Sequence, residues 1–284
     1  MLWLKRSIAF MVAGAGVLTA GGVAQAGFGQ PTPWEMGLQG SASPVMADIV
    51  WFNGYLFWIT TAIAVFVMVL LLIIIFRFNS RANPVPSRTT HNTTIEVLWT
   101  VVPVLILVTI AVPSFRLLFY QLNIPKYDMT VQATGKQWFW TYTYPKEKFE
   151  FDSLIVQDKD LKAGQPRLLA VDNDMVVPIN KVVRVLVVGA DVIHSFSVPS
   201  FGIKIDAVPG RMNETWFKAT RLGTYYGQCS QLCGRDHAFM PIAVRVVSEQ
   251  DYEAWLAQAE KKYASTDDTA SPTAVAVAEA AKIK

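Results

Sequence analysis

Two long stretches without charged side chains constrain this chain more than any other feature. The first covers residues 49–76, and the second has its uncharged core at residues 97–115. About 20 consecutive apolar residues are enough for a helix to cross a bilayer. The sequence therefore predicts transmembrane helices at residues 49–76 and 95–120. The alternative is a helical hairpin buried in a soluble core.

The charges and aromatic residues at the ends of these stretches indicate their orientation. The intervening loop, residues 77–94, carries Arg77, Arg81 and Arg88 and no acidic residue. By the positive-inside rule this loop is cytoplasmic. Aromatic residues gather at the other end of the first stretch, as in an interfacial belt: Trp51, Tyr55 and Trp58. Pro103 and Pro113 predict kinks in the second helix.

The N-terminal residues have the pattern of an export signal. Lys5 and Arg6 precede an apolar run, and Ala24-Gln25-Ala26 forms a small-residue cleavage site. Residues 1–26 are therefore interpreted as a cleaved signal peptide. The alternative is a membrane anchor, for which the apolar run is short. Residues 27–48, rich in Gly, Pro and Ser, are expected to form an extended leader.

The residues after the second apolar stretch have the pattern of a small β-protein. Short runs rich in β-branched and aromatic residues recur between turn signals, which predicts a β-sandwich or barrel over residues 121–248. These runs are MTVQAT, KQWFWTYTY, VVRVLVV, IHSFSV, ETWFKAT, TYYGQC and PIAVRVV. A helix is expected at residues 249–264, with Tyr252, Trp255 and Leu256 on one face. The tail, residues 265–284, lacks core-forming side chains and is expected to be disordered.

Charge and motifs exclude several classes of function. The chain has 284 residues and a formal net charge of +3, too small to argue for nucleic-acid binding. It contains no Gly-rich phosphate loop, no Ser-His-Asp order and no HExxH helix.

The segment YYGQCSQLCGRDHAFM concentrates residues that bind soft metals. It contains both cysteines of the chain, Cys229 and Cys233, followed by His237 and Met240. Thiolate, imidazole and thioether groups favour copper or zinc over magnesium or calcium. His194, in the run ADVIHSFSVP, is the only further histidine on the same side of the membrane. Two thiolates four residues apart can bridge two copper ions, whereas a single copper ion needs only one.

Two simpler interpretations compete with copper. Cysteines of an exported chain can form a disulfide, and a Cys2His2 set can hold zinc. Neither uses Met240, so the complete ligand set favours copper.

From about residue 44 to 256, the chain resembles subunit II of haem–copper cytochrome c oxidases of the bacterial and mitochondrial type. The resemblance is carried by the two-span hairpin, the cluster QWFWTY, the segment ADVIHSFSVPSFGIKIDAVPGR and the cysteine loop. It implies a two-helix transmembrane hairpin followed by an all-β cupredoxin-like sandwich. It also implies a binuclear copper A centre, in which the two thiolates bridge the metals. The matching ligands are His194, Cys229, Cys233, His237, Met240 and the backbone carbonyl of Gln231.

The resemblance also assigns roles outside the copper loop. Trp138 matches the tryptophan through which electrons enter, while Trp140, Tyr142 and Tyr144 are expected in the core. Glu96 falls where the family places the entrance of a proton pathway, with His91 in the same loop; the alternative is a helix-start carboxylate. Three charged positions match the family near its subunit I interface, and a surface salt bridge explains them equally well: Lys204, Asp206 and Arg211.

Two departures from the family pattern bear on function. Family members usually have Glu between the cysteines, where its carboxylate reaches a magnesium ion shared with subunit I. Here Gln231 offers a neutral amide, a weaker ligand for a hard cation, so weaker or absent magnesium is expected. Secondly, the segment PKEKFEFD mixes both charges where the family is acidic. A neutral, acidic or membrane-tethered cytochrome is therefore expected to dock through apolar contacts around Trp138.

The sequence thus predicts the electron-accepting subunit of a respiratory cytochrome c oxidase. Electrons from cytochrome c, or another periplasmic donor, would pass to haem in subunit I for reduction of oxygen to water coupled to proton pumping. Subunit I, subunit III and the lipid bilayer are the expected partners, with the β domain in the periplasm and the hairpin in the bacterial inner membrane. A copper-delivery protein is the main rival; a quinol oxidase subunit II would lack the copper ligands.

Overall fold

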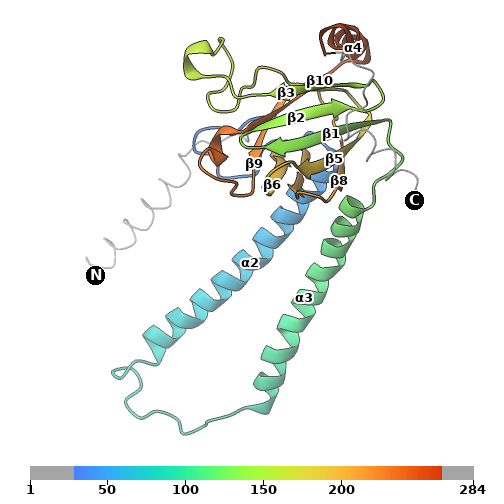
Figure 1. Cartoon of the computed structure of the whole chain (residues 1–284). Helices are drawn as coiled ribbons and strands as arrows, with labels where there is room; N and C mark the ends of the chain where they lie inside the picture. The colour runs from blue at the N-terminus through green and yellow to red at the C-terminus, as the bar shows by residue number, and fades with distance from the viewer. Residues whose placement is uncertain (1–28, 264–284) are drawn as a thin grey trace.

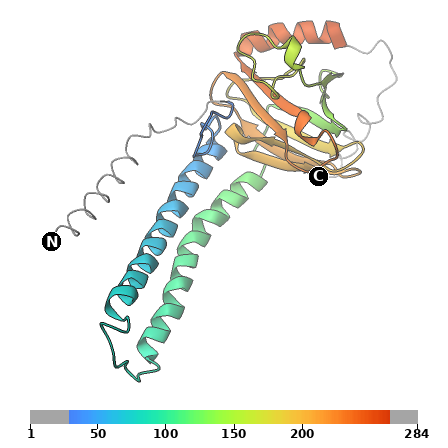
Figure 2. The same ribbon diagram turned by 90° about the vertical axis from the view of Figure 1, so that its left-hand side faces the viewer.

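The computed structural model describes residues 29–263. The expected signal peptide and the tail at residues 265–284 lie outside this range. Helices α2 (Pro44–Arg77) and α3 (Thr93–Leu122) run side by side away from a β domain. Helix α4 (Glu249–Tyr263) lies on that domain, away from the helix pair (Figures 1 and 2).

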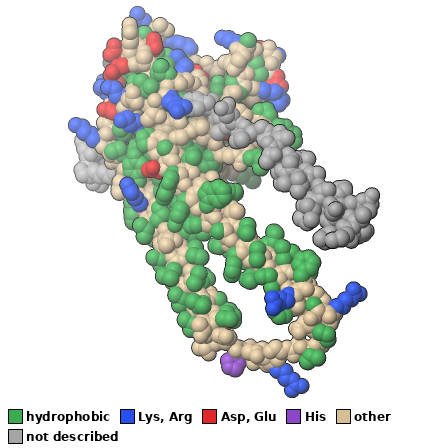
Figure 3. Space-filling view, turned by 180° about the vertical axis from the view of Figure 1, so that it is seen from behind, with side chains coloured by type: hydrophobic (Ala, Val, Ile, Leu, Met, Phe, Trp, Pro, Cys, Tyr) green, Lys and Arg blue, Asp and Glu red, His purple; other side chains and the backbone are tan. Residues whose placement is uncertain are grey.

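Helices α2 and α3 expose their apolar side chains. Their most apolar 18-residue windows have mean hydropathies of 3.1 and 2.5, and none of either window is buried. Figure 3 shows apolar side chains along both helices and basic side chains around the loop that joins them. A hairpin in a soluble core would be buried, so that alternative is wrong, and both helices have the length and surface of membrane spans.

Helix α2 begins earlier than expected because Ser43 caps it. The Ser43 hydroxyl accepts a hydrogen bond from the Met46 amide at 3.0 Å and donates one to the Phe201 carbonyl at 2.7 Å. Pro44 occupies the first turn, where its missing N–H costs nothing. Residues 44–48, expected in the extended leader, are therefore helical. The cap fixes the start of α2 to the β domain.

Helix α3 continues through both of its prolines. Pro113 has no N–H to donate to the carbonyl of Thr109, four residues earlier. The Tyr55 hydroxyl of α2 donates to this carbonyl instead, at 3.3 Å. A hydrogen bond between the helices thus replaces one lost within a helix, which explains how the proline is tolerated.

The β domain is a sandwich of two five-stranded sheets, as predicted. Core side chains such as Trp140, Phe196 and Ile242 are fully buried. Within the sheets, β1 pairs with β5, and β4 with β10, in parallel; the other pairs are antiparallel. The first sheet has the order β3 (Phe149–Ser153), β2 (Phe139–Tyr144), β1 (Met129–Lys136), β5 (Val182–Gly189), β8 (Asn213–Lys218). The second has the order β4 (Met175–Pro178), β10 (Pro241–Val247), β9 (Gly223–Cys229), β6 (His194–Val198), β7 (Ile203–Ala207).

Strands β3, β4 and β7 were missing from the sequence prediction. Strand β4 has four residues and is buried throughout, so it shows no alternation. Strands β3 and β7 alternate apolar and charged residues over only five positions, and both are edge strands. Of the predicted strand KQWFWTYTY, Phe139–Tyr144 forms β2, but the expected start through Trp138 was wrong, because Gln137 and Trp138 form the turn between β1 and β2.

Short 3-10 helices occupy three loops: η1 (Asp158–Asp160), η2 (Pro199–Phe201) and η3 (His237–Phe239). Helix α4 packs its Trp255 ring 5.3 Å from Tyr144 and 6.0 Å from Phe149, between ring centroids. Trp255 and Leu256 lie on its packed face, as predicted.

Candidate metal centre

Two neighbouring strands and one loop bring the expected metal ligands together. His194 is the first residue of β6 and Cys229 the last of β9, and these strands pair in the sheet. The loop from β9 to β10 folds back over them with Cys233, His237 and Met240. The ligand atoms of His194, Cys229 and Cys233 lie within 4.8 Å of one another, and all three residues are buried.

The distances divide the ligands into two similar sets around the two thiols. The Cys229 Sγ lies 4.0 Å from His194 Nδ1 and 3.3 Å from the Gln231 carbonyl. The Cys233 Sγ lies 3.5 Å from both His237 Nδ1 and Met240 Sδ. Each thiol therefore has one imidazole and one weaker donor beside it.

The two cysteines are free, with their Sγ atoms 3.8 Å apart. A disulfide has an S–S length of about 2.05 Å, so this structure does not contain one. Both thiols remain available as metal ligands.

Asp191 holds the His194 ring, and the sequence analysis missed it. His194 Nε2 lies 2.8 Å from Asp191 Oδ1, which leaves Nδ1 facing Cys229. Backbone amides of Gln137 and Val192 also donate to the carboxylate, at 2.7 and 2.6 Å. Such outer carboxylates fix the orientation and tautomer of metal-binding histidines. The Asp-x-x-His spacing in ADVIH was the available signal.

The same contacts shift the pKa values of this pair. Burial raises the pKa of Asp191, but hydrogen bonds from His194 and the two amides outweigh it and leave the pKa lowered. Burial lowers the pKa of His194, whereas its contacts with Cys229 and Asp191 leave it raised. The Asp191 carboxylate is thus held ionised beside the ring.

The two thiols are electrostatically unequal. Burial raises the pKa of Cys229, but hydrogen bonding with His194 and the nearby backbone reverses this and lowers it. The pKa of Cys233 is raised by burial and by the negative charge on Cys229. A metal that binds both sulfurs must therefore displace a proton from Cys233.

Gly135 lets strand β1 approach the centre. A Cβ at this position would lie 2.9 Å from atoms of the His194 ring. The Trp140 ring also meets His194 edge to face, with centroids 6.2 Å apart. The ring position therefore depends on a missing side chain that motif spacing does not reveal.

Trp138 contacts the backbone of the metal loop. Its Nε1 donates to the Cys233 carbonyl at 3.2 Å, and the Gln137 side-chain amide donates to the same oxygen at 2.8 Å. The Arg235 guanidinium lies 5.5 Å from the Trp138 ring centroid. In contrast, Trp140, Tyr142 and Tyr144 are fully buried in the core, as expected.

An apolar surface surrounds Trp138. Leu232 and Phe239 of the metal loop are 77% and 45% exposed, and Leu154 is 45% exposed. Trp138, Leu154 and Phe239 line a shallow hollow of about 690 Å³. The charged residues at this hollow are of both signs: Asp158, Lys159, Arg167 and Asp236.

The other predicted site residues lie away from the metal ligands. Glu96 is in the first turn of α3, where its carboxylate accepts a hydrogen bond from the Asn92 backbone amide at 3.3 Å. Asn92 caps the helix, because its side-chain oxygen accepts a hydrogen bond from the Ile95 amide. His91 is exposed, with Nδ1 3.3 Å from the Thr90 hydroxyl.

The edge strand β7 and the residues just beyond it carry three charged side chains whose roles were predicted from the sequence: Lys204, Asp206 and Arg211. Within residues 29–263, none of the three forms a salt bridge. The interpretation of these charges as a surface salt bridge is therefore wrong for this part of the chain.

A β-sandwich that carries a two-cysteine metal loop above two membrane-type helices defines a membrane-anchored redox subunit. Two family models match the chain: cytochrome c oxidase subunit II, periplasmic domain, over residues 129–247, and the transmembrane domain of the same subunit over residues 31–117. The chain belongs to the cytochrome c oxidase subunit II family. It is a subunit of a respiratory oxidoreductase complex and is associated with the other subunits of that complex.

Individual relatives agree with the family models. The chain is 51% identical over 241 residues to a probable cytochrome c oxidase subunit 2 of Rickettsia bellii, and the matched residues cover 84% of this chain and 90% of that protein. It is 48% identical over 249 residues to cytochrome c oxidase subunit 2 of Cereibacter sphaeroides, covering 81% and 82%. A crystal structure of the periplasmic domain of subunit II of cytochrome oxidase of Bradyrhizobium japonicum is 63% identical, with a TM-score of 0.47, covering 50% of this chain and 99% of that one.

Proposed function

We propose that this chain receives electrons at a binuclear copper centre and passes them to haem in subunit I, where oxygen is reduced to water with proton pumping. The electron-accepting role agrees with the family. The observation that carries the copper proposal is the pair of free thiols 3.8 Å apart, each with its own histidine and weak donor.

The ligand set favours two copper ions over one zinc ion. Zinc in a closed Cys2His2 site would leave Met240 unused. Met240 is only 1% exposed, and its Sδ is directed at Cys233 from 3.5 Å. A weak thioether beside a His and a thiolate is typical of copper electron-transfer sites. The thiolates of Cys229 and Cys233 would bridge the two ions, and His194, His237, Met240 and the Gln231 carbonyl would complete them.

Trp138 is the proposed point at which electrons enter. Its indole N–H bonds to the carbonyl of Cys233, so the ring is coupled to a bridging ligand through one hydrogen bond and that residue's covalent bonds. We propose that the donor, a cytochrome c or another periplasmic carrier, docks on the apolar surface around this ring. A steep loss of turnover with rising salt would contradict mainly apolar docking.

The structure of the segment PKEKFEFD supports this weak dependence on charge. Phe149 and Phe151 point into the core, whereas Glu150 and Asp152, which alternate with them, point outward. Glu150 accepts a hydrogen bond from Thr143 at 3.1 Å, and Asp152 accepts one from Thr141 at 2.6 Å. Asp152 also lies 3.8 Å from the Lys136 ammonium, so this carboxylate is paired with a cation and is a poor steering charge.

Magnesium binding is proposed to be weak or absent. The Gln231 carbonyl already faces Cys229, and its side chain ends in a neutral amide. Metal analysis of the assembled complex tests this: tightly held, stoichiometric magnesium would contradict it.

Glu96 is proposed as the entrance of a proton pathway, with His91 as an accessory group. The contact from Glu96 to the Asn92 amide also gives this carboxylate a capping role. Glu96→Gln keeps an oxygen for the cap and removes the charge, whereas Glu96→Ala removes both. Slower oxygen consumption in both variants would support the proton pathway. A defect in Glu96→Ala alone would show that Glu96 acts only as a helix-capping residue.

The proposed setting is a bacterial inner membrane, with subunits I and III as neighbours. The β domain would face the periplasm, and the arginine-rich loop at residues 77–94 the cytoplasm.

The deciding experiment is copper analysis and electron paramagnetic resonance on the purified full chain loaded with copper. Two copper ions per chain with a seven-line hyperfine pattern, from one unpaired electron shared by two nuclei, are expected. One copper ion with four lines, or a silent zinc protein, would overturn the proposal.

A further inference from the structure

A cleft between α2 and α3 lies next to the β domain, far along the chain from the metal ligands. It has a volume of about 940 Å³, at the upper end of the range of about 300–1,000 Å³ typical of ligand sites. The metal centre and the proposed proton pathway use none of its lining residues. Its walls are lined by Asp48, Trp51, Phe52, Tyr55, Val112, Pro113, Arg116, Leu117, Phe119, Tyr120 and Asn123.

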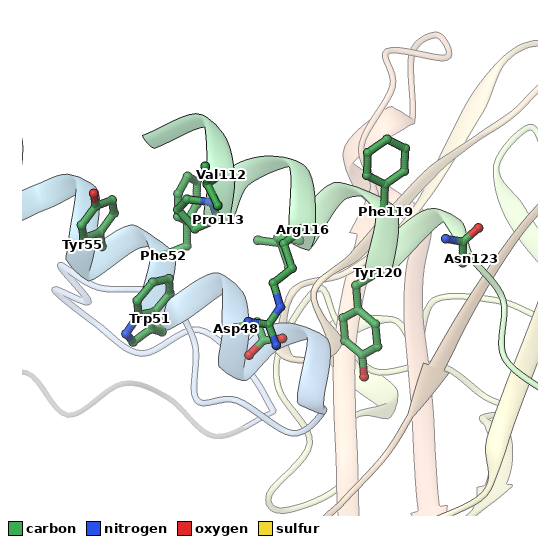
Figure 4. Close-up of a pocket in the computed structure, with 11 residues that line it drawn as sticks. Asp48, Trp51, Phe52, Tyr55, Val112, Pro113, Arg116, Phe119, Tyr120 and Asn123 are labelled. Atoms are coloured by element: carbon green, nitrogen blue, oxygen red, sulfur yellow. The ribbon is translucent and has the colours of Figure 1, made fainter. Parts of the chain in front are cut away.

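The cleft contains one charge of each sign. Figure 4 shows the side chains of Asp48 on α2 and Arg116 on α3 extending toward one another across the cleft, with their ends overlapping in this view. Among residues 29–263 neither side chain has an ion-pair partner, although both line the same space. Apart from Arg77 and Glu96 at the opposite ends, they are the only charged residues of the two helices. Such rare charges near a membrane are expected to bind something.

The remaining walls match the boundary between lipid headgroups and acyl chains. Trp51 stacks on Tyr55 with centroids 5.7 Å apart, and Tyr120 meets Trp216 of β8 edge to face at 5.4 Å. Aromatic side chains of this kind gather at membrane interfaces. Further along the helices, Phe52, Val112 and Pro113 give the cleft an apolar floor.

Two contacts hold the cleft in shape. The Tyr55 hydroxyl donates to the Thr109 carbonyl at 3.3 Å and joins the two helices beside the cleft. At the end of α3, the Trp216 indole N–H donates to the Gln121 carbonyl at 3.2 Å and fixes this helix to the sheet. The two charges are therefore presented by walls that are tied to one another.

We propose that this cleft binds one zwitterionic phospholipid with a primary ammonium headgroup. The Arg116 guanidinium offers paired donors to the phosphate. The Asp48 carboxylate accepts from the ammonium, and the acyl chains follow the apolar floor. A dipolar headgroup satisfies both charges at once, which an anionic or an apolar ligand does not.

A transmembrane helix of another subunit is the competing occupant, and the cleft suits it poorly. Helix contacts in membranes favour Gly, Ala, Ser and Thr, which let backbones approach. None of these four residue types is among the lining residues. The inference rests on the membrane location of the hairpin and is independent of copper binding.

The test uses the assembled oxidase in lipid nanodiscs that contain equal amounts of phosphatidylethanolamine, phosphatidylcholine and phosphatidylglycerol with identical acyl chains. Native mass spectrometry after partial removal of lipid counts and identifies the retained molecules. One phosphatidylethanolamine per chain is expected to resist removal. Arg116→Gln should lower its retention by about tenfold, the usual effect of losing a charged hydrogen bond.

The matched variants test the contacts with the phosphate and with the ammonium of the headgroup separately. Asp48→Asn should abolish the preference for phosphatidylethanolamine over phosphatidylglycerol while a lipid is still retained. Arg77→Gln, which removes a cation at the other end of α2, is the control and should match the unaltered chain. Unchanged assembly with the other subunits of the oxidase verifies folding. Arg116→Lys is expected to retain more lipid than Arg116→Gln, and it replaces that variant if Arg116→Gln fails to assemble.

Equal retention in Arg116→Gln and Arg77→Gln would overturn the proposal. A high yield of disulfide cross-links between Val112→Cys and a cysteine introduced in another subunit would also overturn the proposal, because a protein helix would then fill the cleft.

Discussion

In the helical hairpin, α2 and α3 satisfy most backbone polar groups within each helix, and their side chains face outward. The metal centre draws instead on the β1–β2 turn, the start of β6 and the β9–β10 loop, which are far apart in the chain. Local hydrogen bonds survive most single changes, whereas a centre assembled from distant segments depends on every contact between them. Substitutions at the metal centre should therefore have larger effects than substitutions in the hairpin.

The largest effect is expected from the bridging thiols. Cys229→Ser and Cys233→Ser should each reduce the copper content from two ions per chain to one or none and abolish the seven-line signal, because a hydroxyl is a poor bridge between coppers. Ser230→Ala, in the same exposed loop, is the control. Two copper ions with an unaltered spectrum in Cys233→Ser would refute the bridged arrangement. The hairpin should insert into membranes in every one of these variants.

A smaller effect is expected at Asp191. Asp191→Ala frees the His194 ring and should weaken copper binding by about 10–100-fold in a chelator competition, the usual cost of losing an outer partner. Asp191→Asn keeps an acceptor for the ring N–H and should recover most of the affinity. Asp158→Ala, which breaks an exposed pair with Arg167, should leave affinity unchanged. Equal affinity in the Ala and unaltered chains would show that Asp191 does not orient the ring.

Gly135→Ala tests the close approach of β1. The added Cβ meets the His194 ring, and the shift needed to relieve this should destabilise the copper-free β domain by about 1–3 kcal/mol. Chemical denaturation followed by tryptophan fluorescence measures the free energy of unfolding. At Gly37, by comparison, a Cβ meets no atom within 4 Å, so Gly37→Ala should change stability by less than about 0.5 kcal/mol. Similar values for both variants would remove the packing argument.

The smallest effect is expected in the hairpin. Tyr55→Phe removes the hydrogen bond to the Thr109 carbonyl and should cost about 0.6 kcal/mol, the average for such bonds between membrane helices. Thr60→Val removes a hydroxyl that bonds within its own helix and should cost less. Unfolding of the hairpin in mixed detergent micelles measures both. A loss above that of Gly135→Ala would contradict the comparison of the two regions.

The sequence predicted the hairpin and the metal ligands for different reasons. A helix in lipid needs only length and apolar composition, so residues 49–76 and 95–120 were recognisable without knowing their neighbours. The ligands were recognisable because Cys229, Cys233, His237 and Met240 lie in one short segment of the sequence. His194 was found by elimination, since few histidines are present. In each case the information is local or compositional.

Only the tertiary structure decided the surroundings of those ligands. Asp191 and Gly135 gain their roles because β1 and β6 come together at the His194 ring. Strand β4 was missed because its four residues carry too little periodicity and its partner, β10, lies far along the chain. Strand β7 pairs with the preceding strand β6 and was missed because five residues carry too little periodicity. The sequence by itself determined which residues can bind a metal and which can cross a membrane. The tertiary structure decided which other side chains hold them in place, because contacts between distant segments leave no spacing to recognise.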